Sequence, residues 1–565
     1  MRPEPPDARR GAPAFDAWLD EFFASYYRYR PVNATFIGVH THDDRLPDLS
    51  RDGQAALESE TRALLRSLER LPPEQLGEAQ AMDRRLAEGF LRIQLWECGS
   101  HHFSRGNPCV YTGEAAFGVI GLLLREFAPF ERRLEAAVAR MDAIPALLRD
   151  GAAAVGRAPA AWVARAVREC DGALALFPSG IATLLADRGV ESPRALAAAG
   201  RAAAAFAEFR RYLDLDLRGR ATEEYACGEE ALALYLRWGH CLSEGAETIA
   251  DRAEDEMAAC EAELAARAGE FGASNWRGAL ARLADRHPTA DAYYRRYQEV
   301  WDEAREAVES HRLVTWPNFP IRYVPRPRWS REAAPYLYFL HYRSPAPCDR
   351  VPIVEYLVTP IEPEMPEAER RRLLRAANDS VIKTNHVVHH GGLGHHVQNW
   401  HAPRAASRIG RIAAADCACR LALFCAGTMA EGWACYATDL MNEIGFLDPL
   451  ERYAQRHARL RMAARALVDV RLHHGAFTLD EAIACYRDRV GMSSEAARDE
   501  GVKNSLFPGA ALMYMVGTDL IHALRRSLAA RPGFDLKTFH DRFLSHGSVP
   551  VALIRDAMTA DASLE

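Results

Sequence analysis

The sequence predicts a mainly α-helical protein, in which long helices form two lobes around a deep cleft and one small β element lies between the lobes. Apolar residues recur at three- and four-residue spacing over most of the 565 residues, as amphipathic helices require. These segments are rich in Ala, Leu, Glu and Arg, which lose little side-chain entropy in a helix. Between residues 314 and 359 the pattern changes to short β-branched and aromatic runs separated by proline, which is typical of strands.

Each element is placed by where its periodicity begins and ends. In the first half the pattern predicts helices over Pro13–Tyr29, Gly53–Leu71, Glu74–Cys98, Pro129–Arg149, Arg194–Leu215, Glu229–Arg267 and Ala290–Leu313. The β element holds the runs Ile321–Val324, Tyr336–Tyr342 and Val351–Val358. In the second half helices are predicted over Pro366–His390, Ala405–Gly445, Asp448–His474, Leu479–Val490, Ser494–Val502 and Pro508–Ala530. The chain thus divides into a disordered N-terminus (1–12), an N-terminal helical lobe (13–313), the β element (314–359) and a second helical lobe (360–565).

Charge and composition exclude several classes of protein. The 70 Lys and Arg against 77 Asp and Glu give a net charge of −7, so no basic surface for nucleic acid is predicted. No run of about 18 uncharged apolar residues predicts a membrane span, and Met1–Pro13 lacks the apolar stretch of a signal peptide. The 12 cysteines follow no disulfide framework, and we expect Cys417 and Cys419 to pack inside a helix. We therefore expect a cytoplasmic protein that binds neither nucleic acid nor membrane.

Histidines are concentrated in one short segment. Six of the 20 histidines lie between His386 and His401, where an even distribution along the chain would place fewer than one. Neutral imidazole is the commonest transition-metal ligand, and crowded imidazoles repel one another when they are protonated. The segment therefore predicts a metal site, and a solvated face of histidines is the alternative interpretation.

The spacing ranks the possible ligand pairs. His389 and His395 form the first-ranked pair, because the three glycines between them allow the helix to break or bulge and bring both rings to one centre. His386 and His390 form the second-ranked pair, since residues at i and i+4 share a helix face. The arrangement lacks the spacing of the zinc peptidase motif H-E-x-x-H.

A carboxylate is expected to complete the site. Glu431 lies among Ala, Gly and Trp in a predicted apolar helix, where a Glu is costly to bury unless it is paired or bound to a cation. Glu431 is therefore the predicted third ligand. The alternative is a buried Glu that is satisfied by an Arg or Tyr from a neighbouring helix.

Four motifs resemble those of the bacterial domain of unknown function 885 family, whose members are similar to helical zinc metallopeptidases. The family motifs read His-Glu-x-x-Pro-Gly-His, Glu-Gly-Trp-Ala, Asp-x-Gly-Leu-His and Pro-Gly-Gln-Ala-Leu-x-Tyr. The corresponding segments here are 389–395, 431–434, 469–473 and 508–514. The resemblance covers nearly the whole chain and implies a metallopeptidase-like fold.

The resemblance also implies roles for individual residues. His389, His395 and Glu431 would hold a divalent metal, with zinc ranked before iron or another transition metal. His473 and Tyr514 would face the substrate and stabilise a developing oxyanion.

Three further residues are assigned to substrate binding: Lys503, His396 and Trp433. Lys503 stands where the family carries an Arg that could hold a carboxylate, so it is the expected contact for an anionic group.

His390 is the main departure from the family, because it replaces the motif Glu that serves as general base. It could take the proton of a water molecule itself, or become a fourth ligand and close the open position of a catalytic metal. The two histidines with one carboxylate also match the ligand set of non-haem iron centres.

These observations predict a metal-dependent hydrolase-like enzyme that acts on a peptide, an amide or a small amino-acid-derived compound, with His390 in a catalytic role. One alternative is a non-hydrolytic metalloenzyme of the non-haem iron type, with oxidative or lyase chemistry in a specialised biosynthetic pathway. The other is a catalytically inactive pseudo-peptidase that acts as a binding protein. The expected partner is a small-molecule or peptide substrate, and the sequence predicts no oligomeric state.

Overall fold

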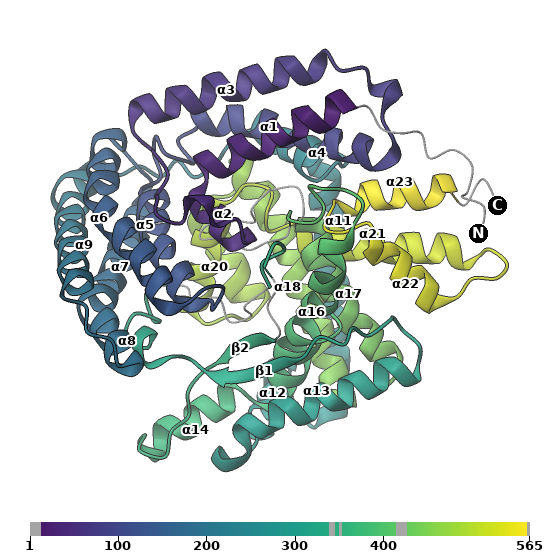
Figure 1. The fold of residues 1–565 in the computed structure, drawn as a ribbon. Coiled ribbons are helices and arrows are strands. Elements are labelled where there is room, and N and C mark those ends of the chain that lie inside the picture. Colours follow the sequence, from purple (N-terminus) through teal and green to yellow (C-terminus); the bar gives the residue numbers. More distant parts are fainter. Residues whose placement is uncertain (1–12, 338–344, 350–352, 414–426, 562–565) are drawn as a thin grey trace, which may run out of the picture.

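The computed structural model of the protein describes residues 13–337, 345–349, 353–413 and 427–561, and over these residues it is built from helices and a single two-stranded sheet (Figure 1). The predicted class, mainly α with one small β element, is confirmed. The segment 1–12 and the cysteines at 417 and 419 lie outside the described residues. No helix in the described part is long and apolar enough to cross a membrane.

The first four helices cover one side of the molecule, at the top of Figure 1. They are α1 (Pro13–Tyr29), α2 (Pro31–Ile37), α3 (Arg51–Glu69) and α4 (Glu78–Gly99). α3 begins after Ser50, whose side-chain oxygen accepts the backbone N–H of Gly53 at 3.1 Å and so satisfies one of the free donors in the first turn. Phe15, Trp18 and Phe22 form the buried face of α1.

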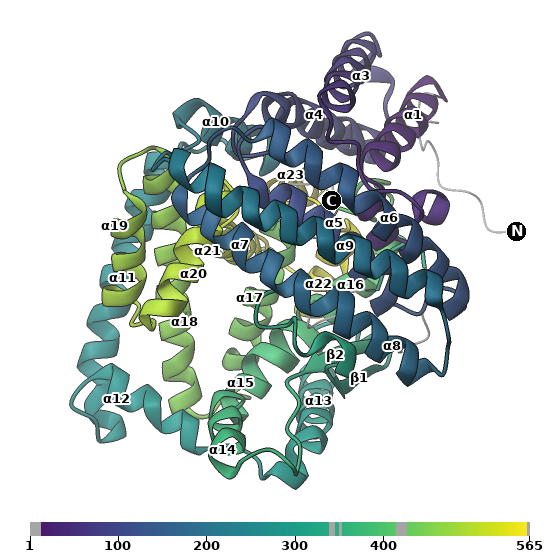
Figure 2. The same cartoon turned by 90° about the vertical axis from the view of Figure 1, so that its left-hand side faces the viewer.

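The next five helices stack beside this group, at the left of Figure 1 and in front in Figure 2. They are α5 (Pro108–Leu124), α6 (Phe130–Ala154), α7 (Ala160–Ala175), α8 (Ile181–Arg188) and α9 (Pro193–Tyr212). The sequence predicts α6 and α9 but not the other three. α5 is buried on nearly every side, so it has no polar face and no amphipathic pattern that would reveal it.

Two predicted long helices of the middle segment are interrupted. The elements there are α10 (Glu229–Leu234), α11 (Ala246–Arg267), α12 (Trp276–Ala281), α13 (Tyr293–Ser310), α14 (Glu367–Ala376) and α15 (Asp379–Val381). Between α10 and α11 Cys241 has a φ of 56°, which an α-helix does not allow. After α14 the Asn378 side chain accepts the N–H of Val381 at 3.1 Å and starts α15, which continues as a π-helix over Ile382–Gly391.

The β element contains two strands rather than three among the described residues. β1 (Ile321–Pro325) and β2 (Val354–Val358) pair in parallel, with Tyr323 opposite Tyr356. In the predicted strand 336–342, Tyr336 and Leu337 form a turn and a bend, and residues 338–342 lie outside the described part. The sheet lies beside α13 at the base of the molecule (Figures 1 and 2).

The last helices run through the centre and the right side of Figure 1. They are α16 (His395–His401), α17 (Gly427–Glu443), α18 (Pro449–His473), α19 (Leu479–Ala484), α20 (Ser494–Leu506), α21 (Met513–Ala529), α22 (Leu536–Ser545) and α23 (Val551–Asp561). The predicted helix over 405–445 is wrong in its first part, because residues 405–413 form bends and turns. Buried Asp83 of α4 holds these turns: its carboxylate accepts the N–H groups of Arg408 and Ile409, each at 2.9 Å.

The hydrophobic core joins the two ends of the chain. One cluster of buried side chains includes Leu19 of α1, Val354 of β2, Trp433 of α17 and Ile554 of α23. A second cluster fills the space among α5–α9, and a third joins α10–α12 to α18–α21. Helices from before residue 314 and after residue 359 therefore share their cores.

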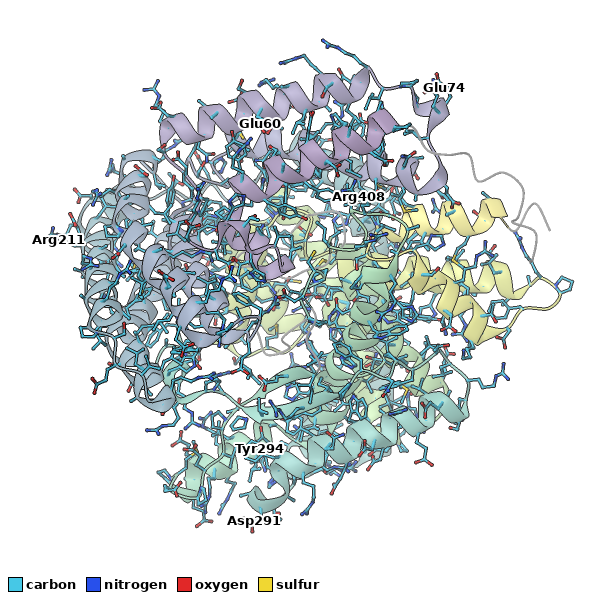
Figure 3. All side chains as sticks on the ribbon, in the orientation of Figure 1. Glu60, Glu74, Arg211, Asp291, Tyr294 and Arg408 are labelled. Atoms are coloured by element: carbon cyan, nitrogen blue, oxygen red, sulfur yellow. The ribbon has the colours of Figure 1, made fainter. Side chains whose placement is uncertain are left out.

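Charged side chains occupy the exterior. Figure 3 shows Glu60, Glu74 and Arg211 at the periphery, on elements from different parts of the fold. Arg408, also labelled there, donates to Asp20 of α1 at 2.6 Å, which adds a surface contact between the turns after α16 and the first helix.

His40 joins α2 to a distant part of the chain. Its Nδ1 and Nε2 atoms each lie 2.9 Å from a carboxylate oxygen, of Asp43 and Asp349 respectively, and its ring stacks on Phe127. Burial alone would lower the pKa of His40, but the hydrogen bonds to Asp349 and Asp43 raise it to about 9. The imidazolium therefore persists well above the pH at which a free histidine loses its proton.

This contact predicts a pH-dependent stability. The pKa of His40 is higher in the folded protein than the unfolded value of about 6.5, so its stabilisation is complete below pH 6.5 and is lost as the pH rises through 9. The loss is about 3 kcal/mol for a shift of this size. We expect the difference in melting temperature between the natural protein and His40→Gln to shrink from pH 6 to pH 9.5. His42→Gln is the matched control, because burial lowers the pKa of His42; an equal pH trend in both variants would contradict the assignment.

Candidate metal centre

A broken helix positions the histidines. His389 lies in the π-helix Ile382–Gly391, and His395 is the first residue of α16. The backbone between them is so tightly folded that a Cβ atom at Gly394 would overlap the carbonyl oxygen of His389, and one at Gly391 would overlap the hydroxyl of Tyr323. Glycine is required at both positions, and π-helical turns of this kind are frequent at functional sites.

The geometry brings the three predicted ligands together. Nε2 of His389 lies 3.4 Å and Nε2 of His395 lies 3.7 Å from the same carboxylate oxygen, Oε2 of Glu431. The two imidazole rings are 4.9 Å apart and nearly perpendicular. In a tetrahedral zinc site, with bonds of about 2.0–2.1 Å, neighbouring ligand atoms are about 3.3 Å apart. The two nitrogen–oxygen distances are therefore close to those between neighbouring ligands of one ion.

A third imidazole belongs to the same cluster. One nitrogen from each of His389, His390 and His395 lies within 4.8 Å of the others. The Nδ1–H of His390 donates to the carbonyl of Asn385 at 2.7 Å, so Nε2 carries the lone pair and is free to accept a proton or a metal.

The second-ranked pair, His386 and His390, does not form. Nδ1 of His386 lies 3.1 Å from the hydroxyl of Tyr297, and the two rings stack. His386 therefore packs against Tyr297 of α13.

Supporting hydrogen bonds orient the ligands. Nδ1–H of His395 donates to Oε1 of Gln398 at 3.2 Å, and Nε2 of Gln398 donates to Ser548 at 3.2 Å. A partner on Nδ1 favours the tautomer in which Nε2 carries the lone pair, which is the usual arrangement for a metal-binding histidine. Gln398 is a positioning residue that the sequence analysis missed, and its place one turn after His395 on α16 is the signal that could have revealed it.

Glu431 is ionised in this environment. Burial alone would raise its pKa, but the two imidazoles hold the pKa of the carboxyl well below its usual range. Its Oε2 atom is buried and accepts no hydrogen bond from any described residue. A buried carboxylate oxygen without a donor, facing two imidazole nitrogens, fits a bound cation.

Burial favours the neutral form of two imidazoles in the cluster, those of His389 and His390. Burial lowers the pKa of His389, and it lowers the pKa of His390 well below the ordinary histidine value with the help of its two neighbours. Neutral imidazole is the form that binds a metal or accepts a proton.

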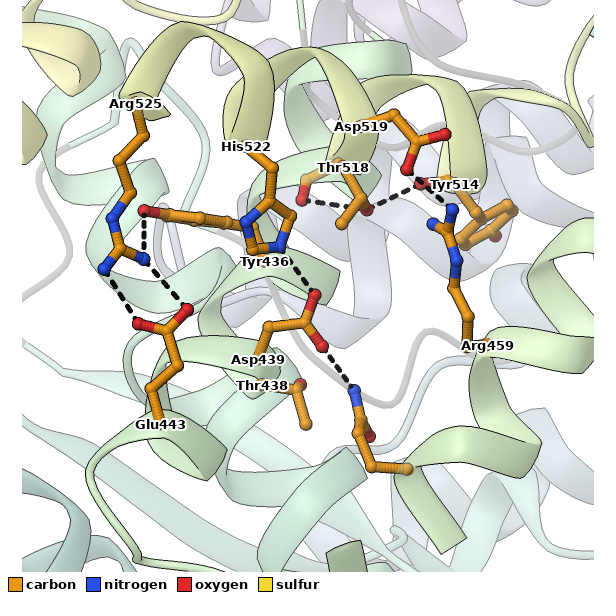
Figure 4. Close-up of polar contacts among 12 residues, drawn as sticks. Tyr436, Thr438, Asp439, Glu443, Arg459, Tyr514, Thr518, Asp519, His522 and Arg525 are labelled. Atoms are coloured by element: carbon orange, nitrogen blue, oxygen red, sulfur yellow. Dashed lines mark hydrogen bonds and ion pairs between the residues drawn. The ribbon is translucent and has the colours of Figure 1, made fainter. Parts of the chain in front are cut away.

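Close helix packing sets Glu431 beside Tyr514. α17 and α21 cross at Gly432 and Gly517, where a Cβ atom at Gly517 would overlap the carbonyl of Thr428. At the same crossing the Thr518 hydroxyl donates to the carbonyl of Tyr514 at 2.7 Å (Figure 4).

Further along the two helices, His522 pairs with Asp439 at 2.9 Å, and Arg525 pairs with Glu443 at 2.8 Å (Figure 4). These contacts fix the two helices against each other.

The Tyr514 hydroxyl is a retained candidate for substrate contact. Burial and the Glu431 charge raise its pKa well above the usual value, so it stays protonated and able to donate. The guanidinium of Arg465 lies over its ring at 4.5 Å and in turn donates to Glu500 at 2.6 Å. The sequence analysis missed this pair; the signal for Arg465 is its place on α18 one turn before the motif residue Asp469.

Three predicted residues lie away from the substrate side. His473 is fully buried on α18 and donates from Nε2 to the carbonyl of Asn504 at 3.0 Å. His396 is fully buried too, stacks on Phe319 and donates to its carbonyl at 2.7 Å. Burial lowers the pKa of each to about 4. In this conformation neither side chain has an exposed atom that could touch a ligand, so the geometry gives no support to the predicted catalytic role of His473 or the predicted substrate contact of His396.

Trp433 also has a structural role instead of the predicted substrate contact. Its side chain is fully buried, stacks on Phe543, and donates from Nε1 to the carbonyl of Leu393 at 2.9 Å. This hydrogen bond connects the glycine-rich segment between His389 and His395 to α17, the helix that carries Glu431. Lys503, in contrast, is exposed to solvent as a substrate contact requires.

Comparisons with known proteins show the family and the fold. The model of a family described as a bacterial protein of unknown function (DUF885) matches residues 31–558. A solved structure from Shewanella oneidensis, described as a "putative lipoprotein of unknown function", is 22% identical, with a TM-score of 0.77 over 97% of this chain and 100% of that chain. A second, a "putative lipoprotein" from Colwellia psychrerythraea, is 17% identical, with a TM-score of 0.77 over 98% and 100%. Among curated proteins, none matches the sequence.

Proposed function

The chain belongs to the DUF885 family of bacterial proteins of unknown function, and from this premise we propose that it is a metal-dependent hydrolase acting on a peptide, an amide or a small amino-acid-derived compound. One observation carries the proposal: two imidazole nitrogens and a donor-free buried carboxylate oxygen face one another at 3.4 and 3.7 Å. His389, His395 and Glu431 would hold the ion, zinc before iron or another transition metal. Such an ion polarises a carbonyl group and makes a water molecule more acidic.

The other residues supply proton transfer and substrate orientation. His390, with its Nδ1–H held by Asn385, presents Nε2 to the ligand group and would take a proton from the attacking water. The Tyr514 hydroxyl would donate a hydrogen bond to the oxygen on which negative charge develops. Together these two groups would replace the missing motif Glu.

A second candidate function rests on the clustering of His390 with the other two imidazoles. If its nitrogen, within 4.8 Å of theirs, joins them on the ion, the centre has four protein ligands. A closed tetrahedral centre is structural, and the protein would then bind ligands without hydrolysing them.

The cytoplasmic location stays a prediction. It is supported by the nine described cysteines, all of which are free. The names of the two solved structures point instead to the cell envelope, because lipoproteins are exported.

The His390→Gln variant separates the two functions. We expect the purified natural chain to bind about one zinc ion and to cleave members of a panel of peptides and amides, with cleavage abolished by a chelator. In His390→Gln, zinc content should be retained and the rate should fall by about 100-fold or more, as is usual for loss of a general base. Elemental analysis and a product assay by mass spectrometry measure both.

Other outcomes decide against the proposal. Zinc-loaded natural protein without cleavage of any panel member, together with activity created by His390→Glu, would favour the closed centre. Failure to bind any divalent metal would remove both functions.

A further inference from the structure

A line of polar side chains runs along α18 at four-residue spacing: Arg461, Arg465, Asp469 and His473. Residues four apart share one face of a helix. Three of the four contact α20 or the segment that leads to Tyr514. Arg465 donates to Glu500 at 2.6 Å, Asp469 accepts the N–H groups of Gly509 and Leu512 at 2.9 Å, and His473 donates to the Asn504 carbonyl. This face of α18 therefore supports the wall that carries Tyr514.

Arg461 is the exception in the line. Its side chain forms no hydrogen bond or ion pair with any described residue, and it is exposed to solvent. The Arg465 charge and burial of the guanidinium nevertheless lower its pKa. Arg461 is thus open to solvent and forms no ion pair with a described residue, although the Glu500 charge partly offsets the effect of Arg465 on its pKa.

Lys503 on α20 is a second exposed cation without an ion pair to a described residue. It lies three residues after Glu500 and directly before Asn504, both of which contact the α18 line. Lys503 is exposed to solvent and makes no hydrogen bond or ion pair within the described part of the chain. Burial and the Arg465 charge lower its pKa. The Arg465–Glu500 pair therefore has an unpartnered cation on each side.

Both cations lie near enough to the candidate metal centre to exchange electrostatic effects with its residues. The Arg461 charge contributes to the lowered pKa of His389, and it acts on Cys435, which lies one turn after Glu431 on α17. The Glu431 charge acts in turn on Lys503. Tyr514 is close to both groups of residues, because Arg465 lies 4.5 Å over its ring and the Glu431 charge raises its pKa.

We infer that Arg461 and Lys503 bind an anionic group of the substrate, so that the substrate is an acidic compound, with a carboxylate or phosphate held one side-chain length from the bond that is cleaved. The inference deepens the proposed function and rests on it. The Arg465 charge repels both cations and lowers the pKa of each, and a bound anion would relieve that repulsion. The planar guanidinium suits the bidentate recognition of a carboxylate or phosphate, and the ammonium group adds a point charge.

Binding measured without turnover tests the inference. We expect benzoylglycine to bind the zinc-loaded full-length protein in a calorimetric titration, and its neutral amide to bind at least tenfold more weakly. Arg461→Gln should weaken benzoylglycine binding at least tenfold and Lys503→Gln to a lesser degree, whereas Arg461→Lys should restore part of it. Inorganic phosphate is the second probe: tighter binding of phosphate than of benzoylglycine would assign the site to phosphorylated substrates.

The control is Arg498→Gln, an exposed cation on α20 outside the face that contacts α18. Equal binding of the acid and the amide, or no binding of either anion, would overturn the inference, as would equal losses in Arg461→Gln and Arg498→Gln. Zinc content is measured in every variant. If the natural protein binds zinc but no anion, only the anion site is refuted. If it binds the anion but no zinc, only the metal-dependent function is refuted.

Discussion

Replacing Glu431 with glutamine is expected to raise the dissociation constant for zinc by about 100-fold or more. Loss of a supporting hydrogen bond alone commonly costs 10- to 100-fold in metal affinity, and this change removes the charged ligand itself. The oxygen concerned is buried, accepts no hydrogen bond from the described residues, and faces both imidazoles. Competition with a chromophoric chelator measures the affinity.

Thermal unfolding gives a second readout of the same change. Zinc at 100 times its dissociation constant should stabilise the natural protein by about 2.7 kcal/mol, and this gain should nearly vanish in Glu431→Gln. Glu443→Gln is the matched control, because Glu443 lies on the same helix and pairs with Arg525 at its exposed end. Equal zinc affinity in the two variants would refute the ligand assignment.

Replacing Gly517 with valine is expected to destabilise the protein by about 3 kcal/mol, at the upper end of the usual cost of overpacking. The added Cβ would overlap the carbonyl oxygen of Thr428, and a backbone atom within a helix cannot move aside. α17 and α21 would have to separate, which would also move Glu431 away from Tyr514. Denaturant unfolding measures the stability, and zinc titration measures the effect on the site.

Gly200→Ala provides the control for helix propensity. Gly200 lies on the exposed face of α9, where a Cβ atom would meet nothing within 4 Å. Alanine there should stabilise the protein by about 1 kcal/mol, because glycine is a poor helix former. A stabilised Gly517→Val would show that the two helices can part without cost.

The approach of His389 and His395 to Glu431 could be predicted because its signals are local. His389, His395 and the glycines between them lie within seven residues, and Glu431 is an acidic residue within an apolar stretch. The burial of His473, His396 and Trp433 could not be predicted, because it depends on which neighbour each side chain meets. All three are fully buried, and nothing in their own segments specifies the carbonyl groups to which they donate.

The fold class and the amphipathic helices could also be predicted from the sequence, but fully buried helices and helix interruptions could not. Amphipathic helices such as α3 and α6 can be predicted from the three- and four-residue spacing of their apolar residues. α5 is buried on nearly all sides and has no polar stripe that would reveal it. Interruptions were harder to see: Asn378 ends one helical run only because its side chain caps the next, and asparagine occurs inside many helices. A role for Arg461 could not be predicted either, because it becomes apparent only when the hydrogen-bond partners of Arg465, Asp469 and His473 on the same face of α18 are known.

The shared core of α1 and α23 has a consequence for the order of events during synthesis. Phe15 and Leu19 pack in the same cluster as Ile554 and Met558, more than 500 positions later. At translation speeds of about 5–20 residues per second, the first helix waits about half a minute or longer for these contacts. Trp18 and Phe22 of α1 can contact α3 and α4 early, but the part of this cluster that α23 completes stays open until the last helix leaves the ribosome, so nascent chains of this protein should depend on chaperones until then.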